Sequence, residues 1–306
     1  MGEILDLQTI NDYNEFLGLE TLNPLVGIVD FSKVEVLKHR CKCFGFYAIF
    51  FGFYGIYLKE KIHGPISYGR NKYDYQKGTL VFIAPGQVGG IDDDGETLHP
   101  QGYALLFHPD LIRGTLFARK MKEYTFFSYE VNEALHMSER ERQTIFNCFE
   151  EIEEELRHPI DKHSRSIIIS NIEVLLNHCL RFYDRQFATR EVINSDVLTR
   201  FEALLNGYFD SRKPIELGLP SVAWCADQLH FSANYFGDLV KKQTGKSAIE
   251  YIHQAIISKV KDRLLGTNKT VSEIAYEVGF QYPHHLSRLF KKVAGCTPNE
   301  YRMQLR

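Results

Sequence analysis

The fold of this chain is decided by a pattern that occurs twice near its end, as VAWCADQLHFSANYFGDLVKKQTG at residues 222–245 and as VSEIAYEVGFQYPHHLSRLFKKVAG at residues 271–295. Phe231 matches Phe280 at an offset of 49, and after one inserted residue Leu239 matches Leu289 at an offset of 50. Two copies are too few for a solenoid. Each copy predicts a short helix, a tight turn and a second helix that ends at a glycine, which is the plan of a helix-turn-helix unit.

The first copy predicts its own helix ends and an outward face. Ser221 and Ser232 are suited to cap its two helices, and Gly245 is suited to end the second one. The apolar residues of the second helix recur at helical spacing and leave a polar side that faces out. That side predicts a DNA-binding set, which is Asn234, Gly237, Asp238, Lys241 and Lys242.

The second copy keeps the apolar positions and changes the outward ones. Pro283 suits the first position of a helix, where its missing N–H is not needed. The outward set here is His284, Ser287, Arg288, Lys291 and Lys292. Shared core positions with different outward positions are expected if two similar scaffolds contact two different DNA segments.

Charge supports a nucleic-acid partner. Basic residues outnumber acidic ones from Ser221 to the end, although the whole chain has a formal net charge of −3. Such asymmetry indicates a DNA-binding end attached to an acidic domain with another task. The alternative is a purely structural helical domain, which explains neither the duplication nor the charge.

The segment between the two copies predicts a connecting rod. Residues 248–265 contain no Gly or Pro, and their apolar stripe runs from Ile249 through Ile252, Ile256 and Val260 to Leu264, with Gly266 as the expected stop. Eighteen residues of helix span about 27 Å. One turn of the DNA duplex is about 34 Å. We therefore expect one chain to contact two successive major grooves of double-stranded DNA, in an operator or promoter.

These motifs resemble those of the AraC/XylS transcription regulators. The resemblance rests on residues 225–236 and 241–247 in the first copy, and on 274–280, 287–292 and 295–302 in the second, within a region that covers about residues 196–306. It implies two helix-turn-helix units joined by a long helix and bound to adjacent major grooves. By position, the base-contacting residues would be Asn234, Gly237 and Asp238 in the first unit and Pro283, His284, Ser287 and Arg288 in the second. Gly237 and Pro283 depart from this pattern because they offer no side-chain donor.

The N-terminal part predicts an all-β unit. Strand-forming stretches are broken by Gly, Pro, Asn and Asp, and they lie at Val26–Phe31, Cys43–Phe51, Gly55–Lys59, Thr79–Ile83 and Tyr103–Phe107. A small barrel or jelly roll fits this spacing. Residues 78–87, GTLVFIAPGQ, resemble the cupin-like sensor domains that precede this DNA-binding module. The fold class expected is α+β, with a cupin-like barrel and its helices in a sensor or dimerisation domain at 1–190, and an all-α DNA-binding domain at 196–306.

Two other functions of the β domain remain open. A metal-dependent cupin enzyme fused to a helical domain would need a His-x-His pair. The histidines in question form no such pair, and they are His39, His63, His99 and His108. Cys41 and Cys43 are better explained as one face of a strand than as ligands. We expect no metal, cofactor or catalytic residue. Aromatic residues could line a small-molecule effector pocket or simply fill the core, and they are Phe44, Phe46, Tyr47 and Phe82. The domain could also only dimerise, in a constitutive DNA binder.

Helices are expected to follow the barrel. Ser138 and Glu141 form a capping box that opens a helix to Arg157, and a longer helix runs from Asp161 to Phe187. The stripe of the longer helix could pack within the chain only, or also against a second copy. The family resemblance favours a homodimer, with the stripe Ile168, Ile172, Leu175, Leu176 and Cys179 at its interface. A helix from Val197 to Tyr208 opens the next domain, and 211–220 is expected to be a loop.

Location follows from what the chain lacks. Its start has no charged, apolar and cleavable leader pattern. The apolar run from Cys43 to Leu58 is too short to span a bilayer. Six scattered cysteines are typical of a reduced compartment. We expect a cytoplasmic protein without membrane contact, with RNA polymerase as a further partner of a promoter-bound regulator.

Overall fold

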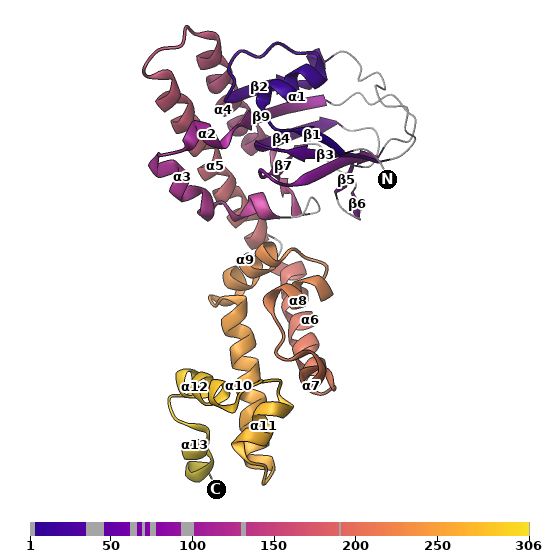
Figure 1. Cartoon of the computed structure of the whole chain (residues 1–306), viewed down its shortest axis with the longest axis vertical. Helices are drawn as coiled ribbons and strands as arrows, with labels where there is room; N and C mark the ends of the chain where they lie inside the picture. Colours follow the sequence, from indigo (N-terminus) through magenta and orange to yellow (C-terminus); the bar gives the residue numbers. More distant parts are fainter. Residues whose placement is uncertain are drawn as a thin grey trace. The chain divides into compact units, whose positions relative to one another are not determined.

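The computed structural model describes residues 4–34, 46–61, 66–68, 71–73, 78–92, 101–129, 133–189 and 191–305 (Figure 1). The chain divides into two compact units, Met1–Ala188 and Thr189–Arg306, called here unit 1 and unit 2. Unit 1 combines antiparallel strands with helices, and unit 2 is helical throughout its described residues. The expected α+β class is therefore confirmed.

The described strands of unit 1 lie in three sheets. The largest is antiparallel and has the spatial order β10 (Leu135–His136), β7 (Thr79–Ile83), β4 (Tyr54–Lys61), β9 (Gln101–Phe107) and β2 (Val26–Asp30). The second contains β1 (Ile4–Leu7), β3 (Phe46–Phe51) and β8 (Val88–Asp92). The third pairs β5 (Ile66–Tyr68) with β6 (Asn71–Tyr73).

These strands test the sequence analysis in part. The expected strands are confirmed at β2, β4, β7 and β9, and β3 occupies the described end of the stretch expected from Cys43. The closed cupin-like barrel stays a prediction, because the described strands form separate sheets. His39, Cys41, Cys43, Phe44, His63 and His99 lie outside the described residues, and the side chains of Phe46 and Tyr47 are not described.

The large sheet has two apolar faces, because successive residues of a strand point to opposite sides. Ala104 and Leu106 of β9 pack in a core with Ile49 of β3 and with Ile10 and Tyr13 of helix α1 (Ile10–Leu17). The sequence analysis missed α1, although its capping box at Thr9 and Asp12 is a readable start signal.

The opposite face of the large sheet packs against helices. Tyr103 of β9 meets Phe146 of α4 (Glu139–Arg157), with ring centroids 5.1 Å apart. Phe82 of β7 meets Tyr183 of α5 (Ser164–Thr189) at 6.2 Å and Phe126 at 4.4 Å. Phe82 therefore lies in the aromatic packing beneath the helices, which agrees with the alternative that it fills the core.

Helices α4 and α5 begin where side chains cap them. The predicted capping box at Ser138 and Glu141 is confirmed. Helix α5 begins at Ser164 rather than at Asp161, because the Asp161 carboxylate accepts hydrogen bonds from the backbone N–H groups of His163 (2.7 Å) and Ser164 (3.0 Å) and so stands before the first turn. Two short helices that were not expected precede them, α2 (Pro109–Ile112) and α3 (Leu116–Lys120).

The apolar stripe of α5 is core in the single chain. All five residues expected at a dimer interface are at most 2% exposed, and they are Ile168, Ile172, Leu175, Leu176 and Cys179. Packing within unit 1 therefore accounts for their burial. The exposed apolar residues of α5 are instead Ile167, at 42%, and Val174, at 48%.

Unit 2 consists of eight described helices. They are α6 (Glu191–Phe209), α7 (Lys213–Leu217), α8 (Val222–Gln228), α9 (Ala233–Thr244), α10 (Ala248–Gly266), α11 (Val271–Glu277), α12 (Pro283–Ala294) and α13 (Pro298–Leu305). Helix α6 begins earlier than the expected Val197. Helix α7 replaces part of the expected loop, because Pro214 has the backbone angle of a first helical turn.

The connecting helix α10 confirms the expected rod with two corrections. It includes Gly266, the expected stop, and Thr267 follows as its C-cap. Ile249, in its first turn, is 43% exposed, whereas the rest of the expected stripe is buried. Around this helix the core is aromatic: Phe201 of α6 meets Phe236 of α9 edge-on at 4.9 Å.

Replacement of Phe236 by alanine tests this core. Phe236 is fully buried, so Phe236→Ala should lower the free energy of unfolding of unit 2 by about 3–5 kcal/mol through lost contacts and a cavity. Trp224, the single tryptophan of the chain, lies in unit 2, and its fluorescence during urea unfolding measures this unit selectively. The exposed neighbour Asn234 gives the control, because Asn234→Ala should change stability by no more than about 0.5 kcal/mol. Equal midpoints for both variants would contradict the assignment of Phe236 to the core.

Candidate nucleic-acid interface

The two copies of the sequence pattern have the same local structure. Each first helix starts at a hydroxyl cap: the Ser221 hydroxyl accepts a bond from the Trp224 N–H at 3.1 Å, and the Thr270 hydroxyl accepts one from the Glu273 N–H at 3.2 Å. Each second helix ends at a left-handed glycine, Gly245 or Gly295. The helix-turn-helix plan and the two glycine stops are confirmed.

The turns between the helices are also equivalent. The Phe231 N–H donates to the Ala226 carbonyl at 2.9 Å, and the Phe280 N–H donates to the Ala275 carbonyl at the same distance. The residue before each phenylalanine has a positive φ, 62° at His230 and 99° at Gly279. Each turn thus reverses the chain in one left-handed step, which directs the second helix away from the first.

The repeat continues past the two glycine stops, where Glu250 and Glu300 occupy corresponding positions. Ser247 and Glu250 form a capping box at the start of α10, and Thr297 and Glu300 make the corresponding bonds at the start of α13. The sequence analysis missed this pair. A hydroxyl residue followed three positions later by Glu is the signal that would have found it.

Helix α9 presents the first predicted DNA-binding set. Asn234, Lys241 and Lys242 are exposed, whereas Gly237 and Asp238 are half-buried. The opposite side of the helix is core, because Tyr235, Phe236, Leu239 and Val240 are each at most 4% exposed. The helix therefore has one apolar side that packs and one polar side with two lysines near its end.

Helix α12 presents the second set. His284, Arg288, Lys291 and Lys292 are exposed. Ser287 is half-buried, and its hydroxyl donates to the Pro283 carbonyl at 3.3 Å, so part of its hydrogen-bonding capacity is used within the helix.

An aromatic cluster at the start of α12 was missed by the sequence analysis. Tyr282 is 56% exposed and lies against His284 and His285, with ring centroids 5.6 Å from each. The two histidine rings are 4.2 Å apart. Exposed aromatic residues directly before an outward-facing helix are the signal that indicates such a cluster.

The lysines of α12 have acidic neighbours. Hydrogen bonds from Ser247 lower the pKa of Glu250, and the positive charge of Lys292 adds to this effect. Burial lowers the pKa of His253, with the charge of Lys292 as the second cause. The positive charge of Lys292 therefore acts on Glu250 and His253 of α10. Lys291 contributes in the same way, after the bonds from Thr297, to the lowered pKa of Glu300.

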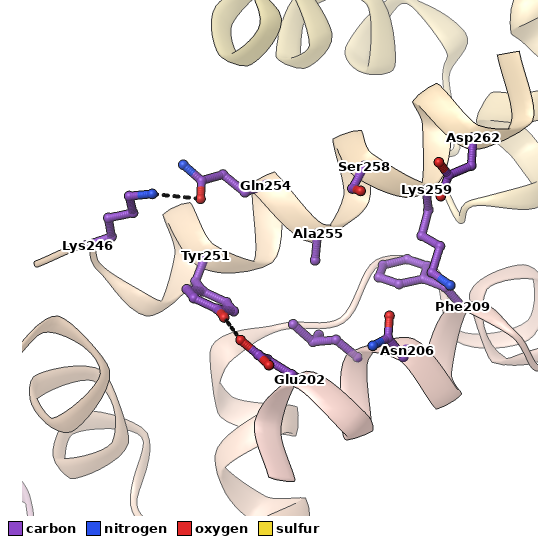
Figure 2. Close-up of a pocket in the computed structure, with 11 residues that line it drawn as sticks. Glu202, Asn206, Phe209, Lys246, Tyr251, Gln254, Ala255, Ser258, Lys259 and Asp262 are labelled. Carbon is purple, nitrogen blue, oxygen red and sulfur yellow. Dashed lines mark hydrogen bonds between the residues drawn. The ribbon is translucent and has the colours of Figure 1, made fainter. Parts of the chain in front are cut away.

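A groove of about 540 Å³ lies between α6 and α10, and Figure 2 shows its lining. Its polar side chains bond largely to one another or to their neighbours. The Tyr251 hydroxyl donates to Glu202, the Lys246 ammonium donates to the Gln254 side chain at 3.0 Å, and Lys259 pairs with Asp210 at 3.0 Å. The groove is thus a largely polar seam between α6 and α10, with Leu205 and Phe209 among its lining residues.

The part of the chain that the structure describes contains no group of three or more His, Cys, Asp or Glu side chains arranged to hold a metal ion. His108, the described member of the histidine set, instead caps α2, where its Nδ1 accepts from the Asp110 N–H at 3.2 Å. No described helix combines the length and apolar character that crossing a membrane requires.

The comparisons with known proteins match this C-terminal part. Residues 225–304 match the family model described as a helix-turn-helix domain. An uncharacterized transcriptional regulatory protein of Bacillus subtilis is 32% identical over 143 residues, which are 45% of this chain and 37% of that protein. An uncharacterized helix-turn-helix regulator of Escherichia coli is 30% identical over 146 residues, 48% of each chain.

A third relative has a stated activity. The transcriptional activator RhaR of Pectobacterium carotovorum is 33% identical over 82 residues, 27% of this chain and 28% of that protein. The chain thus spans less than half the length of these relatives. Family model, relatives and the repeated geometry agree on one region. The C-terminal part of this chain is an AraC-type helix-turn-helix DNA-binding domain.

Proposed function

We propose that this chain is a sequence-specific transcription regulator whose two helix-turn-helix units enter successive major grooves of promoter DNA. The observation that supports it most is the repetition in space: the hydroxyl caps of the first helices, the turns and the glycine stops are equivalent in both helix-turn-helix units, while the exposed residues of α9 and α12 differ. Equivalent scaffolds with different polar faces are suited to two different DNA segments.

The exposed side chains differ in which part of the DNA their chemistry suits. Lys241 and Lys242 on α9, and Lys291 on α12, are point charges that suit phosphate oxygens and give salt-dependent affinity. Asn234 and Arg288 have paired hydrogen-bonding groups, which suit adenine and guanine edges respectively. His284 is a further base-contacting residue at the start of α12. Lys292 is exposed as well and also suits a phosphate oxygen.

The connecting helix supports contact with two grooves. Helix α10 has 19 residues and is therefore about 28 Å long. One turn of the duplex is about 34 Å, which is close to this length. Two grooves on one face of the DNA are the targets at such a separation.

Unit 1, in this proposal, is the dimerisation and sensor domain, with a cupin-like barrel. Because the predicted stripe of α5 is buried, a dimer contact on this helix has to use its outer side, where Ile167 and Val174 are two turns apart and about half exposed. A second copy of the chain, a small-molecule effector and RNA polymerase are the partners of such a regulator. Dimerisation raises avidity for paired sites without new base contacts.

The first prediction here concerns Arg288. Arg288→Ala should reduce affinity for the specific site by about 1–3 kcal/mol and relax the preference for one base pair, because a bidentate contact to guanine is lost. A gel-shift titration of the full chain at fixed salt measures both effects. Arg119→Ala is the matched control, since Arg119 is an exposed arginine on α3 in unit 1 and its loss changes the total charge equally. Equal affinity of Arg288→Ala and Arg119→Ala would rule out a base contact by Arg288.

The second prediction concerns dimerisation. A charge in a dimer contact must be desolvated, so Val174→Glu should raise the dimer dissociation constant at least about tenfold. Sedimentation velocity of the full chain at several concentrations measures this constant. Leu22→Glu serves as control, because Leu22 is 55% exposed and follows α1, which packs on the other face of the large sheet from α5. A chain that sediments as a monomer before mutation would remove the dimer from the proposal.

The third prediction separates a regulator from a metal-dependent enzyme. Treatment with a chelator should leave specific DNA binding unchanged, and elemental analysis of the purified chain should give well under one metal ion per chain. One tightly held ion per chain, lost together with a measurable turnover, would favour the cupin enzyme instead.

A further inference from the structure

We propose that helix α7 and the glycine after it hold the second helix-turn-helix unit at a fixed orientation to the first, and that the contact between Gly218 and Gly279 determines which spacing of DNA half-sites the chain accepts. This inference rests on the proposed function, because it assigns spacing selectivity to the same DNA-binding surface. Gly279 would act as a positioning residue, since it touches the α7 segment and not the DNA.

The contact itself is between backbones. Gly279 lies in the turn between α11 and α12 and has a φ of 99°. A Cβ atom at Gly279 would lie 2.6 Å from the Gly218 carbonyl oxygen and 2.9 Å from the Pro214 carbonyl oxygen. Distances under 3.0 Å to backbone atoms cannot be relieved by a side-chain rotation. Only glycine allows the turn of the second helix-turn-helix unit to approach α7 this closely.

The α7 segment is in turn attached to the first helix-turn-helix unit. The Tyr208 hydroxyl of α6 donates to the Gly218 carbonyl at 2.8 Å. The Tyr208 ring meets Trp224 of α8 edge-on, with centroids 4.8 Å apart. The Lys213 ammonium lies 5.4 Å from the centre of the Trp224 ring. The carbonyl of Gly218 therefore lies between the Tyr208 hydroxyl on one side and the turn of the second helix-turn-helix unit on the other.

A second tie runs parallel to this one. Arg263 of α10 pairs with Glu277 of α11 at 3.2 Å and donates to the Phe209 carbonyl at the end of α6, at 3.4 Å. Glu277 also accepts from Lys269. The end of α6 is thus linked to the first helix of the second unit through side chains as well as through α7.

These contacts change what α10 alone would allow. Two units joined only by a single helix can twist and tilt about it. A second attachment between α7 and the turn at Gly279 closes a ring of contacts, so the angle between α9 and α12 becomes fixed. Rigid placement of two DNA-contacting helices makes binding sensitive to the distance and helical phase of their targets, because a misplaced half-site has to be reached by deforming the protein or the DNA.

The glycines of unit 2 supply a matched set of variants. Gly279, Gly245 and Gly295 all have a positive φ, so alanine strains the backbone at each of them. At Gly245 and Gly295 a Cβ atom meets nothing within 4 Å, whereas at Gly279 it clashes with α7. Comparison of the three alanine variants therefore separates loss of the α7 contact from backbone strain.

The experiment begins with the full chain and a pool of random duplexes, from which the preferred site of the parent is selected. Duplexes are then made in which the two half-sites are one or two base pairs closer or further apart. Gel-shift titration gives the ratio of affinities between the preferred spacing and each altered spacing. We expect Gly279→Ala to reduce this ratio at least about threefold. Its affinity for an isolated half-site should stay within about twofold of the parent. A twofold change in affinity is well under the roughly tenfold change that 1.4 kcal/mol produces.

Controls and contrary outcomes are distinct. Gly245→Ala and Gly295→Ala should keep the spacing profile of the parent. Tyr208→Phe removes the hydroxyl that holds Gly218 and keeps the ring, so it should broaden the spacing profile as Gly279→Ala does. If Trp224 fluorescence shows that Gly279→Ala is unfolded, Tyr208→Phe alone tests the spacing inference. An unchanged profile in the folded variants would overturn the spacing inference alone. A parent that selects no site at all would overturn the proposed function and this inference with it.

Discussion

The DNA-binding part of this chain depends on one backbone hydrogen bond that is made twice. In each unit the amide of a phenylalanine, Phe231 or Phe280, donates to the carbonyl of an alanine five residues before it, across a single left-handed residue. This bond ends the first helix and sets the direction of the second. Because the turn is so short, the apolar sides of both helices face the same core, and the polar side of the second helix has to face out.

The polar side obtained in this way is not uniform. Asn234, Arg288 and Lys241 are exposed, whereas Ser287 is half-buried and bonds within its helix. A residue that is already bonded to its own protein has to give up that bond before it contacts DNA, and this costs free energy. The geometry therefore ranks residues that the sequence pattern treats as equivalent.

Unit 1 illustrates how burial changes the meaning of a stripe. The periodicity of α5 identifies an apolar side, and Leu175, Leu176 and Cys179 on that side are completely buried within the unit. A stripe in a sequence is the same whether it packs on a sheet of its own chain or on a second chain, because both partners are apolar. The sequence pattern did not indicate the outer residues Ile167 and Val174, because two isolated apolar residues do not make a periodic signal.

Sequence alone determined the local features of this protein: the two helix-turn-helix units, the stops at Gly245 and Gly295, the capping box at Ser138 and the strands β2, β4, β7 and β9. These depend on hydrogen bonds and periodicities within a few residues, so they can be predicted from the sequence. Tertiary structure decided the rest: the covering of α5, the place of Phe82 beneath the helices and the approach of Gly279 to Gly218. Gly279 and Gly218 are far apart in sequence, and only the packing of α7 against the second unit brings their backbones together, which no local pattern records.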